Sequence, residues 1–133
     1  MTIQQVAAAG DPSGLPGPAE TAWQDVCRVD ALTPERGATA LVAGQPVALF
    51  RLDDDEVLAI DDVDPFWGVA VLSRGLVGCL GGRDTVASPL HKQRFDLRTG
   101  ACLDDAAVAV ATWPVRINLG RVEVGRVTSS AVP

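Results

Sequence analysis

Short apolar runs rich in valine, each followed by turn-forming residues, constrain this fold more than any other feature of the sequence. The 133 residues include 18 valines, and β-branched side chains fit pleated strands better than helices. The runs give about nine or ten candidate strands and one short helical piece at most. This pattern predicts an all-β protein, either a sandwich or an open barrel.

The candidate strands alternate with turns. Strands are expected at residues 23–27, 39–42, 47–52, 57–60, 85–88, 94–97, 108–111, 115–119 and 121–124. Hairpin turns are expected at residues 43–46, 81–84 and 118–120, and a tight turn with positive φ at Gly100. Asp30 or Thr33 could cap a short helical piece within residues 29–35. The stretch at 61–82 is less regular.

Chain length and the distribution of proline and glycine define one folded body. A chain of 133 residues has room for one domain. Residues 1–21 are rich in proline and glycine and lack an apolar period, so they bury too little to offset their ordering entropy. We therefore expect a flexible tail at 1–21, a folded domain at 22–127 and a second flexible tail at 128–133.

The charge of the chain argues against two classes of partner. Its formal net charge is −6 at pH 7, whereas nucleic acids and anionic membranes attract clustered lysine and arginine. No apolar run approaches the roughly 20 residues that cross a bilayer, and no signal-peptide pattern is visible at the N-terminus. We therefore expect no nucleic-acid partner, no membrane partner and a cytoplasmic location.

Candidate catalytic and metal-binding side chains are few and scattered. The single histidine, His91, lies near Ser88 and Asp96, but no nucleophile-elbow motif accompanies them. Ser88 is therefore interpreted as a serine that ends a strand, and no residue receives a catalytic role. Three widely spaced cysteines predict small buried or half-buried thiols rather than disulfides. The carboxylates at 61, 62 and 64 lack ligand spacing and are interpreted as a solvated turn.

The most informative stretch, residues 87–100, resembles the second cluster-binding box of Rieske iron–sulfur proteins, which reads C-P-x-H-G-x-x-F-D-x-x-T-G. The scaffold residues of that box are retained, namely Pro89, Phe95, Asp96, Thr99 and Gly100. Ser88 stands at the cysteine position and His91 at the histidine position, and Lys92 replaces the glycine.

The first Rieske box, C-x-H-x-x-A-x-L, is expected upstream. Residues 65–72 fit its frame through Ala70 and Leu72, with Pro65 at the cysteine position and Trp67 at the histidine position. A Rieske [2Fe–2S] centre needs two cysteines and two histidines. Three of the four ligand positions have therefore lost their ligand. The resemblance predicts the fold without a cofactor or metal in this chain.

The two boxes together resemble the small subunit of NAD(P)H-dependent nitrite reductase, a Rieske-like family without the cluster. The resemblance covers roughly residues 23–125 and implies a Rieske-like (ISP-type) fold of stacked antiparallel sheets. It also implies a large catalytic subunit that carries FAD, an iron–sulfur cluster and sirohaem. That subunit would reduce nitrite to ammonium in nitrate assimilation, with this chain as its accessory subunit.

In a Rieske domain the two boxes form loops at one tip, so the resemblance places residues 65–68 beside residues 90–94. Aromatic and arginine side chains are typical interface anchors. The candidate residues for docking on the large subunit are therefore Phe66, Trp67, His91, Lys92 and Arg94. Alternatively, Phe66 and Trp67 fold inward and fill the vacated cluster pocket.

Two other functions remain open at this stage. The first is a Rieske-type [2Fe–2S] electron-transfer ferredoxin, against which the missing ligands count. The second is a cofactor-free docking module for another redox enzyme. A neighbouring coding region for a sirohaem-type reductase would favour the nitrite reductase subunit over this second alternative.

Overall fold

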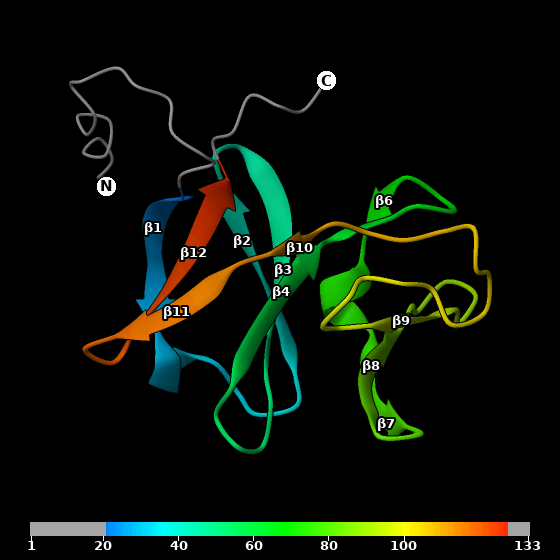
Figure 1. Ribbon diagram of the computed structural model, residues 1–133, viewed down its shortest axis with the longest axis horizontal. Coiled ribbons are helices and arrows are strands. Elements are labelled where there is room, and N and C mark those ends of the chain that lie inside the picture. The colour runs from blue at the N-terminus through cyan, green and yellow to red at the C-terminus, as the bar shows by residue number, and fades with distance from the viewer. Residues whose placement is uncertain (1–20, 128–133) are drawn as a thin grey trace.

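Antiparallel strands dominate the structure, a computed structural model that describes residues 21–127 (Figure 1). The strands are β1 (Thr21–Arg28), β2 (Gly37–Val42), β3 (Gln45–Arg51), β4 (Val57–Asp61), β5 (Val63–Asp64), β6 (Val69–Ala70), β7 (Leu76–Leu80), β8 (Arg83–Ala87), β9 (Arg94–Asp96), β10 (Thr112–Trp113), β11 (Val115–Asn118) and β12 (Arg121–Val127). Two 3₁₀ helices, η1 (Val29–Ala31) and η2 (Leu72–Arg74), are also present. The predicted all-β class is confirmed. The expected tails lie outside the described residues, except that Thr21 begins β1.

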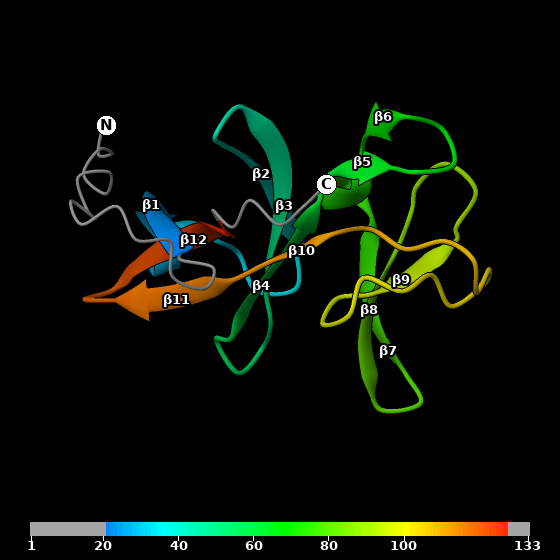
Figure 2. The same ribbon diagram turned by 45° about the horizontal axis from the view of Figure 1, so that its top comes forward.

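The strands form three larger sheets and one short ribbon. The central sheet has the order β10-β4-β3-β2, the second β1-β12-β11 and the third β7-β8-β9, while β5 and β6 form the ribbon. Strand pairing within these sheets is antiparallel. Figure 2 shows the central sheet between the other two. The predicted arrangement of stacked antiparallel sheets is therefore confirmed.

Strand β3 is buried on both faces and connects two hydrophobic cores. Val47 and Leu49 belong to the core shared with β1 and β12. Ala48 and Phe50, which point the other way, belong to the core shared with β8 and β9. A strand that is covered on both faces has no polar alternation, which explains the uninterrupted apolar run at 47–50.

Three hairpins close through two-residue turns in which both residues have positive φ. The φ angles are 53° and 81° for Ala43 and Gly44, 60° and 82° for Gly81 and Gly82, and 53° and 78° for Leu119 and Gly120. This type I′ conformation matches the twist of the adjoining strands. The three predicted hairpins are confirmed. All three loops are shorter than expected, because residues 45–46, residues 83–84 and Asn118 already pair within strands.

The expected strand at 108–111 is wrong. Only the isolated bridge between Ala101 and Ala109 forms there, and β10 begins at Thr112. Gly100 adopts the predicted positive φ, 80°, and lies so close to Val110 that a Cβ on it would collide with the Val110 carbonyl oxygen. The Val110 N–H donates to the Gly100 carbonyl at 2.8 Å. This segment is therefore held against the turn instead of extending a sheet.

Two other local expectations need correction. Strand β7 forms within residues 61–82, the stretch that showed no regular pattern. The strand was not predicted because Gly78 interrupts its apolar run. The short helical piece is η1, which begins at Val29, and no side chain caps its N-terminus. Thr33 lies beyond the end of η1 and does not start a helix.

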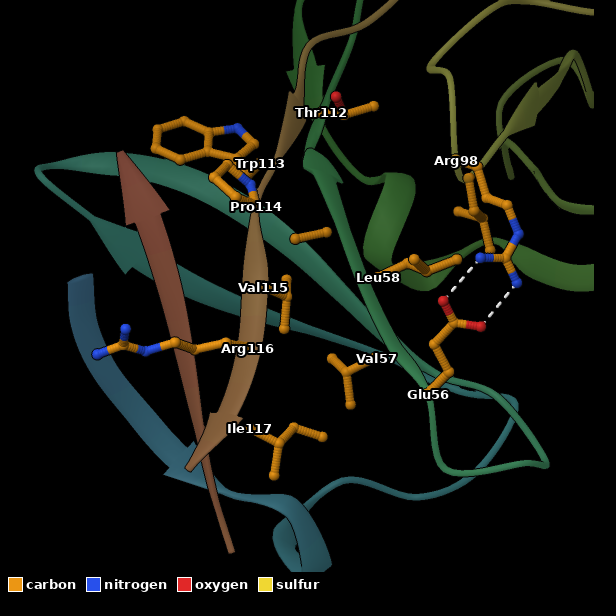
Figure 3. Close-up of a pocket in the computed structure, with 12 residues that line it drawn as sticks. Glu56, Val57, Leu58, Arg98, Thr112, Trp113, Pro114, Val115, Arg116 and Ile117 are labelled. Carbon is orange, nitrogen blue, oxygen red and sulfur yellow. Dashed lines mark hydrogen bonds and ion pairs between the residues drawn. The ribbon is translucent and has the colours of Figure 1, made fainter. Parts of the chain in front are cut away.

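Arg98, in the turn after β9, connects the third sheet to the central sheet. Its guanidinium donates two hydrogen bonds of 2.7 Å to the carboxylate of Glu56, which immediately precedes β4 (Figure 3). The same guanidinium donates to Asp84 of β8 at 3.0 Å. The hydrogen bonds from Arg98 lower the pKa of Glu56 below its ordinary value. We call this three-residue contact the Arg98 clamp.

Replacing Arg98 with methionine should lower the free energy of unfolding by about 0.2–1 kcal/mol at pH 7, the usual range for exposed ion pairs. Because the pKa of Glu56 is lowered by folding, its ion pair stabilises the protein above the unfolded-state pKa. That stability is lost as the pH falls through the folded-state pKa. Urea unfolding of both proteins at decreasing pH should show that the difference between their free energies of unfolding becomes smaller. A difference that does not change with pH would contradict an electrostatic clamp.

Candidate functional site

Two loops meet beside the third sheet, and they are the two segments that resemble Rieske boxes. The first loop, residues 65–68, connects β5 to β6, and the second, residues 88–93, connects β8 to β9. The hydroxyl of Ser88 lies 2.6 Å from the carboxylate of Asp64. The rings of Trp67 and His91 lie 4.8 Å apart. The structure therefore brings the predicted loops together at one tip.

Asp64 is fully buried at the start of the first loop. Its Oδ2 accepts the hydrogen bond from Ser88 Oγ, and its Oδ1 accepts one from the backbone N–H of Phe66 at 2.8 Å. Its backbone carbonyl accepts from the N–H groups of Trp67 and Gly68 at 3.2 and 2.7 Å. Asp64 thus fixes the backbone of the first loop and binds the second loop at the same time.

Ser88 is the matching residue of the second loop, and it is 1% exposed. Its hydroxyl donates to Asp64 and accepts from the N–H of Leu90 at 3.2 Å. Its carbonyl accepts from the N–H of Lys92 at 2.9 Å. Lys92 has φ 64°, the left-handed conformation that glycine adopts most easily. The lysine therefore keeps a backbone conformation suited to the glycine that it replaces in the motif.

Asp62, two residues before Asp64, is a second buried carboxylate. It accepts hydrogen bonds from the N–H of Ser73 at 2.7 Å and from the hydroxyl of Thr39 at 3.0 Å. The hydroxyls of Thr39 and Ser73 lie 2.7 Å apart. The interpretation of residues 61–64 as a solvated turn is therefore wrong for Asp62 and Asp64. Their partners are distant in sequence, so local charge spacing could not reveal them.

The two adjacent aromatic residues of the first loop point in opposite directions. Phe66 is half-buried and packs against the core, with its ring centroid 6.3 Å from that of Phe95. Trp67 is 53% exposed, and its ring stacks on His91 at an interplanar angle of 11°. Phe66 thus covers the core beneath the loops, while Trp67 and His91 form an exposed aromatic pair.

The two cationic candidates also differ in their surroundings. Lys92 is exposed beside His91. Arg94 donates to the carboxylate of Asp104 at 2.8 and 3.3 Å, and its own N–H donates to the same carboxylate at 2.8 Å. These bonds lower the pKa of Asp104 and raise that of Arg94. Arg94 is therefore held by an intramolecular ion pair.

The surface of the two loops is mainly apolar and aromatic. Besides Trp67, the exposed side chains include Val69 at 47% and Leu90 at 40%. We define the tip patch as the exposed side chains Trp67, Val69, Leu90, His91 and Lys92. A patch of this composition is suited to protein–protein contact rather than to proton transfer or nucleophilic attack.

The side chains at the four ligand positions do not fit a Rieske cluster. Pro65 has no donor atom that can bind iron, Trp67 is stacked on His91, and the hydroxyl of Ser88 is hydrogen-bonded to Asp64. His91 is one imidazole where two histidines and two cysteines are required. Within residues 21–127, no group of three or more His, Cys, Asp or Glu side chains is arranged to hold a metal ion.

The cysteines lie elsewhere in the fold. Cys102 is buried and Cys27 is half-buried, as predicted, but Cys79 on β7 is exposed. Burial raises the pKa of the Cys27 thiol. None of the three thiols belongs to the two loops.

A separate groove of about 660 Å³ opens between β4 and β11 (Figure 3). Its walls include Val57, Val115 and Ile117, and the ion pair of Glu56 with Arg98 lies at its edge. The groove lies where the chain crosses from one sheet to another. Strand β10 pairs with β4, whereas β11, which follows it, pairs with β12. It contains none of the predicted site residues. Sequence reasoning missed it because no local pattern marks the divergence of two strands.

Among the described residues, no helix has the length and apolar character needed to cross a membrane.

The sequence matches the family model of the Rieske-like [2Fe-2S] domain over residues 22–125. It is 43% identical over 103 residues to the small subunit of nitrite reductase (NADH) from Escherichia coli K12, covering 77% of this chain and 95% of that protein.

Two further similarities extend this comparison. A crystal structure from Mycobacterium tuberculosis, assigned as a small subunit of NADH-dependent nitrite reductase, superposes with a TM-score of 0.81 and 49% identity. The superposition covers 83% of this chain and 99% of that one. The large subunit of nitrite reductase [NAD(P)H] from Klebsiella oxytoca is 39% identical over 131 residues, covering 93% of this chain but 14% of that protein.

Replacing Ser88 with alanine should lower the free energy of unfolding by about 1–3 kcal/mol, because the buried carboxylate of Asp64 loses a charge-assisted hydrogen bond. Urea unfolding measures this loss. Ser88→Cys brings a larger sulfur atom and a weaker donor to the same buried site, so it should not restore the stability of the unaltered protein. The double variant Asp64→Asn/Ser88→Ala should lose less free energy of unfolding than the sum of the losses in the two single variants. Full additivity would contradict the contact.

Proposed function

This chain belongs to the Rieske-like [2Fe-2S] domain family, alongside the small subunits of NAD(P)H-dependent nitrite reductase, and we propose that it acts as the accessory subunit of such an enzyme. In this role it binds a large catalytic subunit in the cytoplasm. That subunit holds FAD, an iron–sulfur cluster and sirohaem, and it uses NAD(P)H to reduce nitrite to ammonium in nitrate assimilation. The accessory chain itself carries no cluster.

The contrast between a retained scaffold and lost ligands carries this proposal. The similarity spans nearly the whole described domain. At the tip, however, the hydroxyl of Ser88 is hydrogen-bonded to Asp64, and the ring of Trp67 is stacked on that of His91. A chain with this donor set cannot carry electrons on a Rieske cluster. Its contribution to a redox enzyme therefore comes from its surface, which disfavours the ferredoxin alternative.

The tip patch is the surface that we assign to the large subunit. Trp67 is a large, rigid side chain, and aromatic residues of this kind dominate the binding energy of many interfaces. His91 supports it by stacking, and Lys92 adds a positive charge at the edge. The Klebsiella relative supports a physical partnership, because a segment similar to this chain is part of a large-subunit polypeptide there.

Replacing Trp67 with alanine should abolish co-purification with the large subunit and leave the melting temperature nearly unchanged, because the side chain is largely exposed. The adjacent Phe66→Ala is a matched control. Phe66 packs on the core, so its loss should lower the free energy of unfolding by about 2 kcal/mol or more. Pull-down of the co-expressed large subunit and thermal unfolding measure the two effects.

Either of two results would contradict docking through the tip patch. The first is retention of the large subunit by Trp67→Ala. The second is a loss of melting temperature in Trp67→Ala as large as that in Phe66→Ala, since this would make Trp67 a core residue. If the unaltered chain captures a different redox enzyme and not the large subunit, the docking-module alternative replaces our proposal.

The anaerobically purified full chain should be colourless and free of iron and acid-labile sulfide, because three ligand positions lack a suitable donor. A visible absorption spectrum, together with chemical assays of iron and sulfide, tests this expectation. Rieske-type absorption with about two irons per chain would reinstate the ferredoxin alternative. The folded state should be checked by circular dichroism on the same sample.

A further inference from the structure

Strand β7 forms an open edge of the third sheet. Within residues 21–127, β8 is the one strand hydrogen-bonded to it. Figures 1 and 2 both show the end of the β7–β8 hairpin standing apart from the other sheets. Leu76 is 78% exposed, Leu80 is 43% exposed, and Cys79 is also exposed. The edge is therefore accessible and apolar.

This edge lacks the usual protection against pairing with another strand. Natural edges carry lysine, proline, a bulge or an inward-pointing charge. Residues 76–80 include no charge and no proline, and the pairing of β7 with β8 shows no register shift. A chain with a formal net charge of −6 repels its own copies in general. Residues 76–80, however, carry no charged side chain, so two copies of β7 could pair without charge repulsion between the strands themselves.

The hairpin geometry defines which backbone groups are available. The two-residue turn at 81–82 makes Leu80 and Arg83 a hydrogen-bonded pair, and such pairs alternate along an antiparallel ladder. Leu76, Gly78 and Leu80 thus direct their N–H and C=O groups toward β8. Those of Val77 and Cys79 point to the open edge.

We infer that β7 pairs in antiparallel fashion with β7 of a second copy, about a two-fold axis at Gly78. In this register Val77 of each copy faces Cys79 of the other, and these are the residues with free backbone groups. Leu76 of each copy faces Leu80 of the other on one face of the joined sheet. The strand is thus complementary to itself in both hydrogen bonding and apolar contact, as an isologous interface requires.

The length of β7 sets the strength of this contact. Five residues span about 17 Å, so the pairing buries less area than the roughly 1,200–2,000 Å² of a stable complex. We therefore assign a weak dimer, formed at high concentration or within a larger assembly. The contact uses no residue of the tip patch, so it stands or fails independently of docking on the large subunit.

A disulfide at the two-fold axis tests the register directly. The variant is Gly78→Cys in the full chain, with Cys79→Ser to remove the native exposed thiol. A Cβ at Gly78 would meet Thr85 Oγ1 at 3.8 Å, an ordinary contact, so the side chain is accommodated. The two new cysteines would face each other as a non-hydrogen-bonded pair, with Cα atoms about 4.5 Å apart, which a disulfide can bridge.

The control is Leu76→Cys in the same Cys79→Ser background. This thiol is also exposed, since Leu76 itself is 78% exposed, but it lies far from its symmetry mate in the proposed register. Under mild oxidation, non-reducing gel electrophoresis should show disulfide dimers of Gly78→Cys forming about tenfold faster than those of Leu76→Cys, because pairing raises the effective thiol concentration. Adding Leu80→Lys to Gly78→Cys should remove this advantage.

A second pair of variants avoids any change at the glycine. Leu76→Cys and Leu80→Cys, distinguished by a tag on one of them, should form a mixed disulfide faster than either forms with itself. Equal rates in all combinations would overturn the proposed register. Retention of the large subunit by the unaltered chain but not by Leu80→Lys, without any β7 disulfide preference, would also overturn it and assign this edge to the large subunit.

Discussion

The hydrogen bond between Asp64 and Ser88 is the contact on which the tip of this molecule depends. A Rieske cluster bonds to both loops and so links them. Here a buried carboxylate on one loop and a buried hydroxyl on the other make that connection at 2.6 Å. A buried carboxylate without hydrogen-bond donors is strongly unfavourable. If the loops separated, Asp64 would lose the hydrogen bond from Ser88 that offsets the cost of its burial. Asp62 extends the same arrangement by binding Ser73 and Thr39 of neighbouring elements.

Much of the fold could be predicted because its determinants are local. The apolar run of β3 and the type I′ turns at Gly44, Gly82 and Gly120 are visible in the sequence. The failures arise where distant contacts decide. The segment at 108–111 looked like a strand, but its contact with Gly100 holds it as a loop. Strand β7 was missed because a glycine at its centre hides the apolar pattern.

The candidate site was predictable in its location but not in its internal geometry. The motif indicated that the two loops meet, and Lys92 retains a glycine-like φ of 64°. The motif could not show that Phe66 turns inward while Trp67 turns outward. That orientation follows from the bond between the N–H of Phe66 and the buried Asp64, which fixes the backbone at this point. Acidic spacing alone had suggested a solvent-exposed turn instead.

The loss of cluster ligands and the exposure of an aromatic face at the tip are one physical change. At the histidine position of the first box, Trp67 replaces a group that would bind iron with one that offers a broad apolar face. His91 can no longer share a cluster with a second histidine, and it supports that face by stacking at 4.8 Å. Contiguous exposed apolar patches mark protein–protein interaction sites in many proteins. In our proposal, the side chains that stand at the ligand positions therefore also favour association with the large subunit.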